Sequence, residues 1–304
     1  MSQIDIDVTE RLEVLEFATA SQLVNQTLKK SKFINGHINI IKGIPSGFFE
    51  FDQITKGFQN AEVSTFAIKK GMGKTAFLLS LINNIGIKNK FSLGLFSPER
   101  TSDKIINRII ESETGTSIEN LNTNNFSEFK KYQIGLTINQ ISNSNIFIDD
   151  TPNLSLKEIY KRATLLKNDR NINIIVIDCI NLFVQSNAER KENNVQFDEI
   201  MIFFKKLSKE LDIPVVLFYQ IDKPYDEIFH LKIPVIKDLP DIIAEHSDNI
   251  YIIHRTDLPY LKEDTISQKD YCEIHIPKQT NSDKMQMVKL KFLPSIDKFV
   301  DCVQ

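Results

Sequence analysis

The sequence predicts an α/β protein with a mainly parallel central sheet, which helices flank and antiparallel strands close. Short runs of β-branched and aromatic residues alternate with helical patterns between residues 63 and 220, as in a doubly wound sheet. Residues 172–177 are apolar apart from Asn173, which is typical of a strand buried on both faces. A glycine-containing turn at 68–75 joins a strand to a helix, and turns of this kind bind phosphate in such sheets.

Length and composition describe an ordinary globular protein. The chain has 304 residues, of which 41% are hydrophobic and 25% charged. This suits one large α/β domain with a short appendage, or two small domains. The formal net charge of −3 gives no global basic field, so any nucleic-acid site must be a local patch.

The sequence favours a cytoplasmic location. Acidic residues begin at Asp5 and no apolar run follows them, so we expect no signal peptide. No segment approaches the roughly 18 apolar residues that a membrane helix needs. The three cysteines, Cys179, Cys272 and Cys302, are far apart and odd in number. They fit neither a disulfide framework nor a metal site, so we expect reduced thiols.

Residues 1–42 are expected to form an N-terminal appendage, and residues 43–304 the main domain. The appendage has helical candidates at 8–24 and 21–30, the first with an imperfect apolar stripe. Two interpretations stay open for it. It is either a loosely packed arm or a helix that docks on a neighbouring subunit.

From residue 43 onward, strands and helices follow in a regular order. Residues 44–58 lead into the first core strand, Pro98 ends the second strand, and Ser155 caps a helix. Strands are expected at 63–67, 91–96, 145–150, 172–177 and 214–220, with three closing strands at 250–253, 271–276 and 288–292. Helices are expected at 74–85, 101–111, 126–141, 155–167 and 197–211, the last of them amphipathic.

The turn after the first strand is a candidate phosphate loop. Lys74 is placed to reach the β- and γ-phosphates of a nucleotide, and the Thr75 hydroxyl to bind magnesium. Ile68 stands where this motif usually has its first glycine, and a capped helix start is the alternative for the turn taken alone. We expect nucleotide binding at Lys70, Gly71, Met72, Gly73, Lys74, Thr75 and Ala76.

Polar residues end the neighbouring strands, and the ends of parallel strands meet at one edge of a sheet. Asp178 is placed to hold the magnesium shell together with Thr75. Glu99 is placed to orient and deprotonate a water molecule in line with the γ-phosphate. Gln220 is placed to sense the phosphate and to move the loop behind it. Each residue alone could merely cap a loop, but together they predict a site for ATP and Mg²⁺.

The order of these segments resembles the ATPase domain of the DnaB family of hexameric replicative helicases, a branch of the RecA-like fold. The resemblance covers residues 43–299 and rests on segments 47–52, 72–75, 96–99, 146–150, 175–178, 205–216 and 278–279. It implies a RecA-like phosphate-loop NTPase. The roles that it implies are nucleotide and magnesium binding for Lys74 and Thr75, the catalytic base for Glu99, the Walker-B acid for Asp178, a link to the DNA loops for Gln220, and contact with the neighbouring subunit's γ-phosphate for Lys278.

Three departures from the family pattern bear on function. The family's N-terminal helicase–primase domain is expected to be absent, with the arm before Gly43 in place of its linker helix. Thr280 stands at the family's arginine-finger position, and such an arginine is worth about 10³–10⁵ in rate, so slow hydrolysis is expected. Pro240 replaces an arginine in the DNA-gripping loop. Replacement charge from Lys223, Lys232 and Lys237, or a merely solvated loop, are equal alternatives.

The function predicted first is that of an ATP-driven DNA helicase or single-stranded-DNA translocase. It is expected to work as a ring-shaped homo-oligomer, a hexamer, with other replication proteins as further partners. The alternative is a catalytically weakened paralogue that acts as a nucleotide-dependent assembly or regulatory partner. A RecA-type recombinase or a circadian-clock-like ATPase on the same core is the third interpretation.

Overall fold

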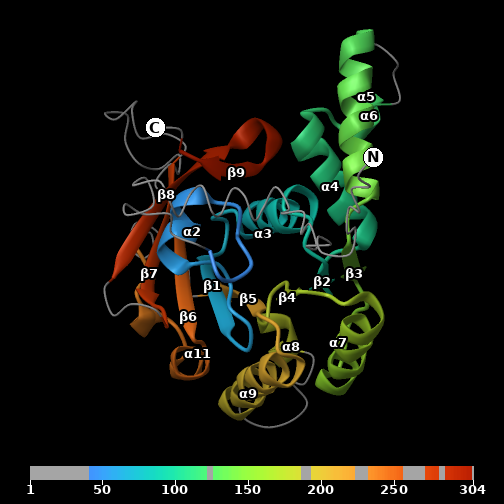
Figure 1. Cartoon of the computed structure of the whole chain (residues 1–304). Helices are drawn as coiled ribbons and strands as arrows, with labels where there is room; N and C mark the ends of the chain where they lie inside the picture. Colours follow the sequence, from blue (N-terminus) through green and yellow to red (C-terminus); the bar gives the residue numbers. More distant parts are fainter. Residues whose placement is uncertain are drawn as a thin grey trace, which may run out of the picture. The chain divides into compact units, whose positions relative to one another are not determined.

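The computed structural model describes residues 41–121, 126–185, 193–222, 232–255, 271–280 and 285–302, with no side chains given for 184–196 (Figure 1). The predicted arm at 1–42 therefore lies outside the described residues, apart from its last two. The boundary between the arm and the main domain stays a prediction.

The described residues contain one sheet with the strand order β3-β2-β4-β5-β1-β6-β7-β8-β9. Its strands are β1 (Val63–Lys69), β2 (Leu93–Phe96), β3 (Ile146–Asp149), β4 (Ile174–Ile177), β5 (Val215–Ile221), β6 (Asn249–Arg255), β7 (Tyr271–Lys278), β8 (Gln286–Leu293) and β9 (Lys298–Asp301). Pairing is parallel from β3 through β6 and antiparallel from β6 to β9. The prediction of a mainly parallel sheet with antiparallel closing strands is confirmed.

The direction of β6 is a correction within that prediction. Residues 250–253 were expected to be the first closing strand, but β6 runs parallel to β1, with Ile253 opposite Ile68. Antiparallel pairing begins only where β7 adds to β6. An unbroken apolar run shows that a strand is buried and does not show its direction, so the sequence could not distinguish the two arrangements.

The expected helices are present within a few residues of their predicted ends. The α-helices are α2 (Phe49–Thr55), α3 (Lys74–Ile82), α4 (Ser102–Thr114), α5 (Ile118–Leu121), α6 (Glu128–Ser142), α7 (Leu156–Arg170), α8 (Asn181–Gln185), α9 (Asn193–Leu211) and α11 (Asp241–His246). The predicted Ser155 cap is confirmed as a capping box, because the Ser155 and Glu158 side chains bond reciprocally to each other's backbone N–H. The helix expected at 74–85 instead changes after Ile82 into the π-helix η2 (Asn83–Lys88).

Two apolar cores lie on the two faces of the sheet, and helices from different parts of the chain cover them (Figure 1). The core under α2, α3 and α4 is rich in aromatic rings centred on Phe66 of β1. The Phe66 ring centroid lies 5.0 Å from that of Phe77, 5.4 Å from that of Phe218 and 4.8 Å from that of Tyr251. The second core lies under α7, α9 and α11. This packing fixes β1, and with it the turn that follows, from both faces.

A buried carboxylate, Asp52, holds the chain that leads into α2. Its oxygens accept the N–H groups of Ser46 at 2.8 Å and Gly47 at 2.9 Å, and the Ser46 hydroxyl accepts the N–H of Phe48. Burial raises the pKa of Asp52 from 3.8 to about 6, although these hydrogen bonds oppose the shift. The ionised form of Asp52 is therefore less favoured than that of an ordinary aspartate, and the folded protein takes up a proton here as pH falls through about 6.

We expect Asp52→Asn to flatten the pH dependence of stability. Because the folded-state pKa lies above the unfolded value, the folded chain binds the extra proton, and the contribution is lost as pH rises through about 6. Between pH 4 and 7 the parent should lose up to about 3 kcal/mol relative to the variant, which cannot ionise. Urea unfolding at several pH values measures this difference. A constant offset between the two proteins would contradict it.

Candidate functional site

The turn between β1 and α3 depends on two glycines with left-handed backbones. Gly71 has φ +83° and Gly73, the N-cap of α3, has φ +89°. A Cβ on Gly73 would also lie 3.2 Å from the ring of Phe299. Both the backbone angle and the lack of space therefore favour glycine at position 73. The turn brings Lys74 to the first position of α3, at the carboxyl edge of the parallel strands.

Lys74 joins two carboxylates at this edge. Its Nζ lies 2.7 Å from Oδ1 of Asp178, which follows β4, and 3.1 Å from Oε2 of Glu99, which follows β2. Asp178 is fully buried and the Lys74 side chain is 8% exposed, whereas the Glu99 side chain is 39% exposed. Burial alone would lower the pKa of Lys74, but the negative charges beside it, chiefly that of Asp178, raise it. Lys74 is therefore a cation throughout the neutral range.

The segment after β2 is fixed to the same cluster. The hydroxyl of the buried Ser97 donates to Oδ2 of Asp178 at 3.0 Å, and the Asp178 N–H donates to the carbonyl of Phe96 at 2.8 Å. The N–H of Arg100 donates to the Ser97 carbonyl at 3.4 Å, which closes a tight turn around Glu99. Both Asp178 oxygens thus have partners, and the turn presents Glu99 at the open side of the cluster.

The other predicted nucleotide-binding residues surround Lys74 along the chain. Lys70 and Gly71 are exposed, and Gly73 and Thr75 are half-buried. Met72 and Ala76 are buried, at 1% exposure each, so their side chains anchor the turn in the core. The turn therefore offers backbone, hydroxyl and ammonium groups between an apolar base and solvent.

Gln220 is tied to this edge through a residue that was not predicted, Asn181. The Asn181 amide donates to the Gln220 carbonyl and accepts the Gln220 N–H, both at 2.9 Å. The Gln220 side chain itself donates to Oδ1 of Asp222 at 2.6 Å. Asn181 lies at the start of α8, shortly after Asp178, so the chain after β4 holds the end of β5 in place.

Lys278 is not brought to the Lys74 cluster within the chain. It ends β7 opposite Ile250, near the start of β6, so it lies toward the amino edge of the parallel strands. Its Nζ donates to the carbonyls of Ala244 and Ser247 at 2.6 Å each, at the end of α11. Thr280 is nearby, and its N–H donates to Oδ1 of Asn249 at 3.0 Å. Contact of Lys278 with a γ-phosphate stays a prediction, and it requires a second subunit.

Two side chains from distant segments complete the surroundings of the turn and were not predicted. Phe299 of β9 lies against Gly73, and Nη1 of Arg255 lies 3.6 Å from the place of a Gly73 Cβ. The Arg255 guanidinium also stacks on the ring of Phe292, 4.0 Å from its centroid. No local pattern marks these residues, because β6, β8 and β9 reach the turn only through the tertiary fold.

Comparisons with known proteins agree with this architecture. The family described as DnaB-like helicase C terminal domain matches residues 43–301. The chain is 29% identical over 299 residues to the replicative DNA helicase DnaB of Geobacillus stearothermophilus, and equally to the replicative DNA helicase DnaC of Bacillus subtilis. Each match covers 97% of this chain and 64% of the relative, so the chain spans under two thirds of their length.

Solved structures show the same fold. One of them, an ATPase domain, superposes with a TM-score of 0.76 at 24% identity, covering 95% of this chain and all of that one. A DnaB-like replicative helicase, studied with its primase interactions, superposes with a TM-score of 0.73 at 24% identity, covering 95% of this chain and 68% of that one. The RecA-like expectation for the fold is thereby confirmed.

We expect Lys74→Met to destabilise the folded protein. The substitution leaves the Asp178 carboxylate fully buried with only the Ser97 hydroxyl as a side-chain donor. An uncompensated buried charge costs about 3–5 kcal/mol. Urea unfolding measures the loss, and Lys74→Met/Asp178→Asn, which removes the charge as well, should recover at least half of it. A single variant as stable as the parent would show that the ion pair does not hold the site together.

Proposed function

Because this chain belongs to the family of DnaB-like helicase C-terminal domains, we propose that it binds and hydrolyses ATP to act as a DNA helicase or single-stranded-DNA translocase. The observation that carries this proposal is the cluster of Lys74, Asp178 and Glu99. It unites a phosphate-loop lysine, a buried acid and a half-open acid at the carboxyl edge of a parallel sheet, where ligands bind in open α/β folds.

The charge of Lys74 supports phosphate binding at this point. In the structure the ammonium is shared between two carboxylates, and the Glu99 contact is the longer and more exposed of the two. A nucleotide triphosphate carries more negative charge than one carboxylate, and the N-terminus of α3 adds favourable backbone potential beside Lys74. We infer that Lys74 exchanges its contact with Glu99 for the β- and γ-phosphates and thereby frees Glu99.

Magnesium fits the oxygen donors present, the Thr75 hydroxyl and the Asp178 carboxylate. In the part of the chain that the structure describes, no group of three or more His, Cys, Asp or Glu side chains could hold a metal. Phosphate oxygens and water would therefore supply the remaining ligands, as is usual for Mg²⁺ with nucleotides. Bound there, the ion would neutralise phosphate charge during hydrolysis.

Glu99 is the residue suited to act as general base. Its partial exposure lets a water molecule reach the carboxylate, whereas Asp178 is fully buried and both its oxygens have donors. Gln220 ends a strand whose backbone Asn181 ties to the segment after Asp178. A shift in that segment on hydrolysis would reach Gln220, which supports its proposed role as the link to the DNA loops.

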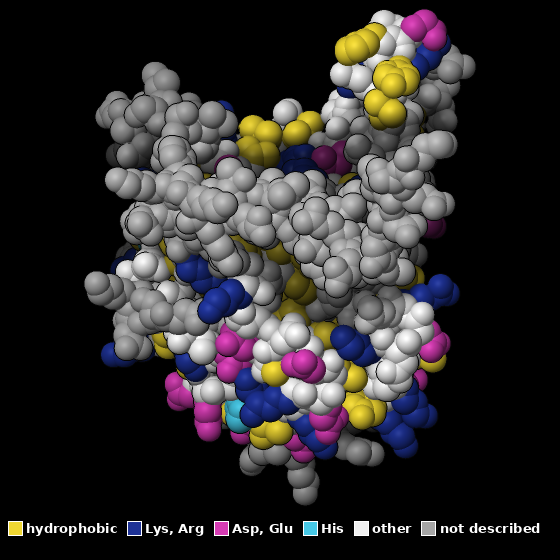
Figure 2. All heavy atoms as spheres, viewed as in Figure 1, with side chains coloured by type: hydrophobic (Ala, Val, Ile, Leu, Met, Phe, Trp, Pro, Cys, Tyr) yellow, Lys and Arg dark blue, Asp and Glu magenta, His cyan; other side chains and the backbone are white. Residues whose placement is uncertain are grey.

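The proposed partners are other copies of this chain, arranged as a hexameric ring, together with single-stranded DNA and other replication proteins. Helix α6 supports a protein contact, because Phe129, Tyr132, Leu136 and Ile138 on it are exposed, the first two at 71% and 66%. Figure 2 shows hydrophobic side chains gathered at the projecting end of the α5–α6 region. No described helix is both long and apolar enough to span a membrane. For a replication protein of this family we propose a cytoplasmic location.

Two features favour a second candidate function, a catalytically weakened paralogue that assembles or regulates in response to nucleotide. Thr280 carries no charge, and its N–H bonds to Asn249 of the same chain. Pro240, the N-cap of α11, likewise offers neither a guanidinium nor a backbone donor to DNA phosphate. Turnover in the presence and absence of single-stranded DNA distinguishes this candidate from a motor.

We expect Glu99→Gln to bind Mg-ATP and to lose hydrolysis, because an amide cannot accept the proton of the attacking water. Turnover should fall at least about 100-fold, the usual contribution of a general base. Stabilisation by Mg-ATP in thermal unfolding should persist. Lys74→Ala is the matched control, since removing the phosphate-binding ammonium should abolish that stabilisation. Equal loss of binding in both variants would assign Glu99 a structural role.

We also expect self-association to depend on the N-terminal arm and on α6. Deleting residues 8–30, or introducing Phe129→Ser with Tyr132→Ser, should lower the mass in solution without unfolding the sheet. The α6 residues are exposed, so their loss removes apolar contact area only between subunits. Light scattering after size exclusion measures the mass, and Lys131→Ser on the same helix is the control. Unchanged mass in all variants would contradict the role of these surfaces.

A further inference from the structure

Because position 280 carries threonine, it supplies no guanidinium to stabilise the charge that develops on phosphate oxygens in the proposed reaction. In ATP hydrolysis the oxygen of water forms a bond to the γ-phosphorus and gives its proton to the base. The bond from that phosphorus to the β,γ-bridging oxygen breaks, and the electron pair leaves with ADP. Charge on the transferred oxygens is usually met by a guanidinium, from the same chain or from a neighbour.

The described chain places one guanidinium at the open side of the Lys74 cluster, that of Arg100. Its Nη2 lies 3.7 Å from Oε1 of Glu99, while the other oxygen of Glu99 accepts from Lys74. Arg100 is therefore separated from the phosphate-loop lysine by a single carboxylate. The turn that carries both residues is anchored through Ser97 to Asp178.

The surroundings of Arg100 leave it with donors to offer. Its side chain is 30% exposed, and its buried Nε has no hydrogen-bond partner in the structure. Arg100 and Thr75 line the same pocket, of about 200 Å³, between α3 and α4. The shared pocket brings Arg100 next to the residue proposed to bind magnesium.

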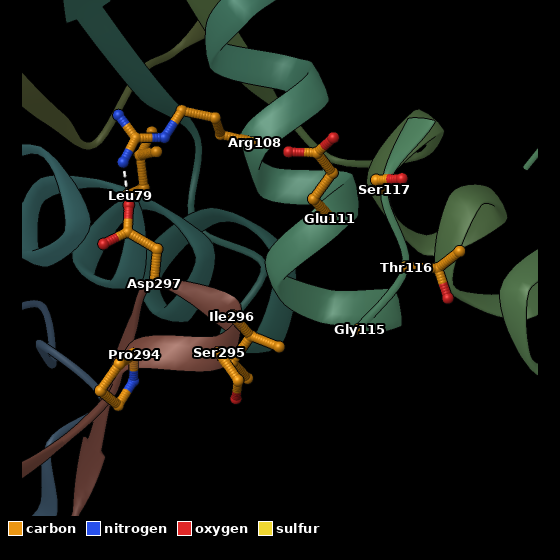
Figure 3. A pocket seen from close by; sticks show the side chains of 10 residues that line it. All are labelled: Leu79, Arg108, Glu111, Gly115, Thr116, Ser117, Pro294, Ser295, Ile296 and Asp297. Atoms are coloured by element: carbon orange, nitrogen blue, oxygen red, sulfur yellow. Dashed lines mark hydrogen bonds and ion pairs between the residues drawn. The ribbon is translucent and has the colours of Figure 1, made fainter. Parts of the chain in front are cut away.

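Two other guanidinium groups near the site, those of Arg108 and Arg255, are engaged elsewhere. Arg108 forms an ion pair with Asp297, and Figure 3 shows the two side chains meeting beside a neighbouring pocket. Arg255 stacks on the Phe292 ring. Lys104 is exposed in the first turn of α4 and lacks the planar fork of donors that matches phosphate oxygens.

We propose that Arg100 is a catalytic residue that supplies in cis the guanidinium absent at position 280, and that it contacts the γ-phosphoryl oxygens as the bond to ADP breaks. The inference rests on the proposed ATP hydrolysis. It assigns Arg100 a contact that is stronger in the transition state than in the bound substrate, so it affects turnover more than nucleotide affinity.

Arg100→Met tests this assignment, since it removes the fork of donors and keeps an unbranched apolar stem. We expect kcat of the assembled protein to fall at least about tenfold, with the Kd for ADP changed less than about twofold. Affinity for ADP with fluoroaluminate, a mimic of the transferring phosphoryl group, should fall as kcat does. Arg100→Lys should remain impaired, whereas Lys104→Met, which removes a charge from the same pocket, should match the parent.

Combination with Thr280→Arg sharpens the test. If the two positions serve the same oxygens, Thr280→Arg should raise turnover more in Arg100→Met than in the parent. Equal gains in both backgrounds, or equal losses of ADP and ADP–fluoroaluminate affinity in Arg100→Met, would overturn the assignment. A parent that binds no nucleotide would instead contradict the proposed function, so the two failures are distinguishable.

Discussion

The site depends on one buried ion pair, between Lys74 and Asp178, which joins residues 104 positions apart in the sequence. A fully buried carboxylate is tolerable only beside a cation and a hydrogen-bond donor, so β1, β2 and β4 must end level with one another. The register meets this requirement, with Phe96 of β2 opposite Ile177 of β4. Glu99, Arg100 and Gln220 take their positions from the same alignment. The aromatic packing around Phe66 holds β1 in place, and with it the turn that leads to Lys74.

Much of this arrangement could be predicted because local sequence patterns indicate it. Apolar runs indicated the parallel strands, polar residues ended them at one edge, and Ser155 began a helix as its type suggests. The direction of β6, helix α2 and the short strand β9 could not be predicted, because their burial does not determine their partners. Asn181, Arg255 and Phe299 reach the site only through contacts between distant segments, and no local spacing encodes those contacts. Arg100 follows a segment that the sequence did single out, but its closeness to Thr75 depends on how α4 packs against α3.

Two side-chain contacts connect the nucleotide edge with the chain on either side of residues 223–231. Asn181 holds the peptide of Gln220, and the buried Lys69, just before the phosphate loop, donates to the carbonyl of Lys232. Burial lowers the pKa of the neighbouring His254 to about 4, and the charge of Lys69 adds to this shift, so the imidazole is neutral at physiological pH. These hydrogen bonds connect the ends of β1, β4 and β5 with the segments on either side of residues 223–231.

The placement of Lys74 and Lys278 toward opposite edges of the sheet bears on the symmetry of an assembly built on the proposed contact between them. A two-fold dimer makes every contact twice, so in it both edges of each copy would lie in one interface; a contact made once per pair needs no such arrangement. Such a contact joins two different surfaces, so a row of copies has one of these surfaces unoccupied at each end. Copies then add in a single direction until the rotation per copy closes a ring, or they continue as a helical filament. In an assembly built on this contact, the angle between the two edges of one chain would set the rotation per copy, and with it the number of copies in a closed ring.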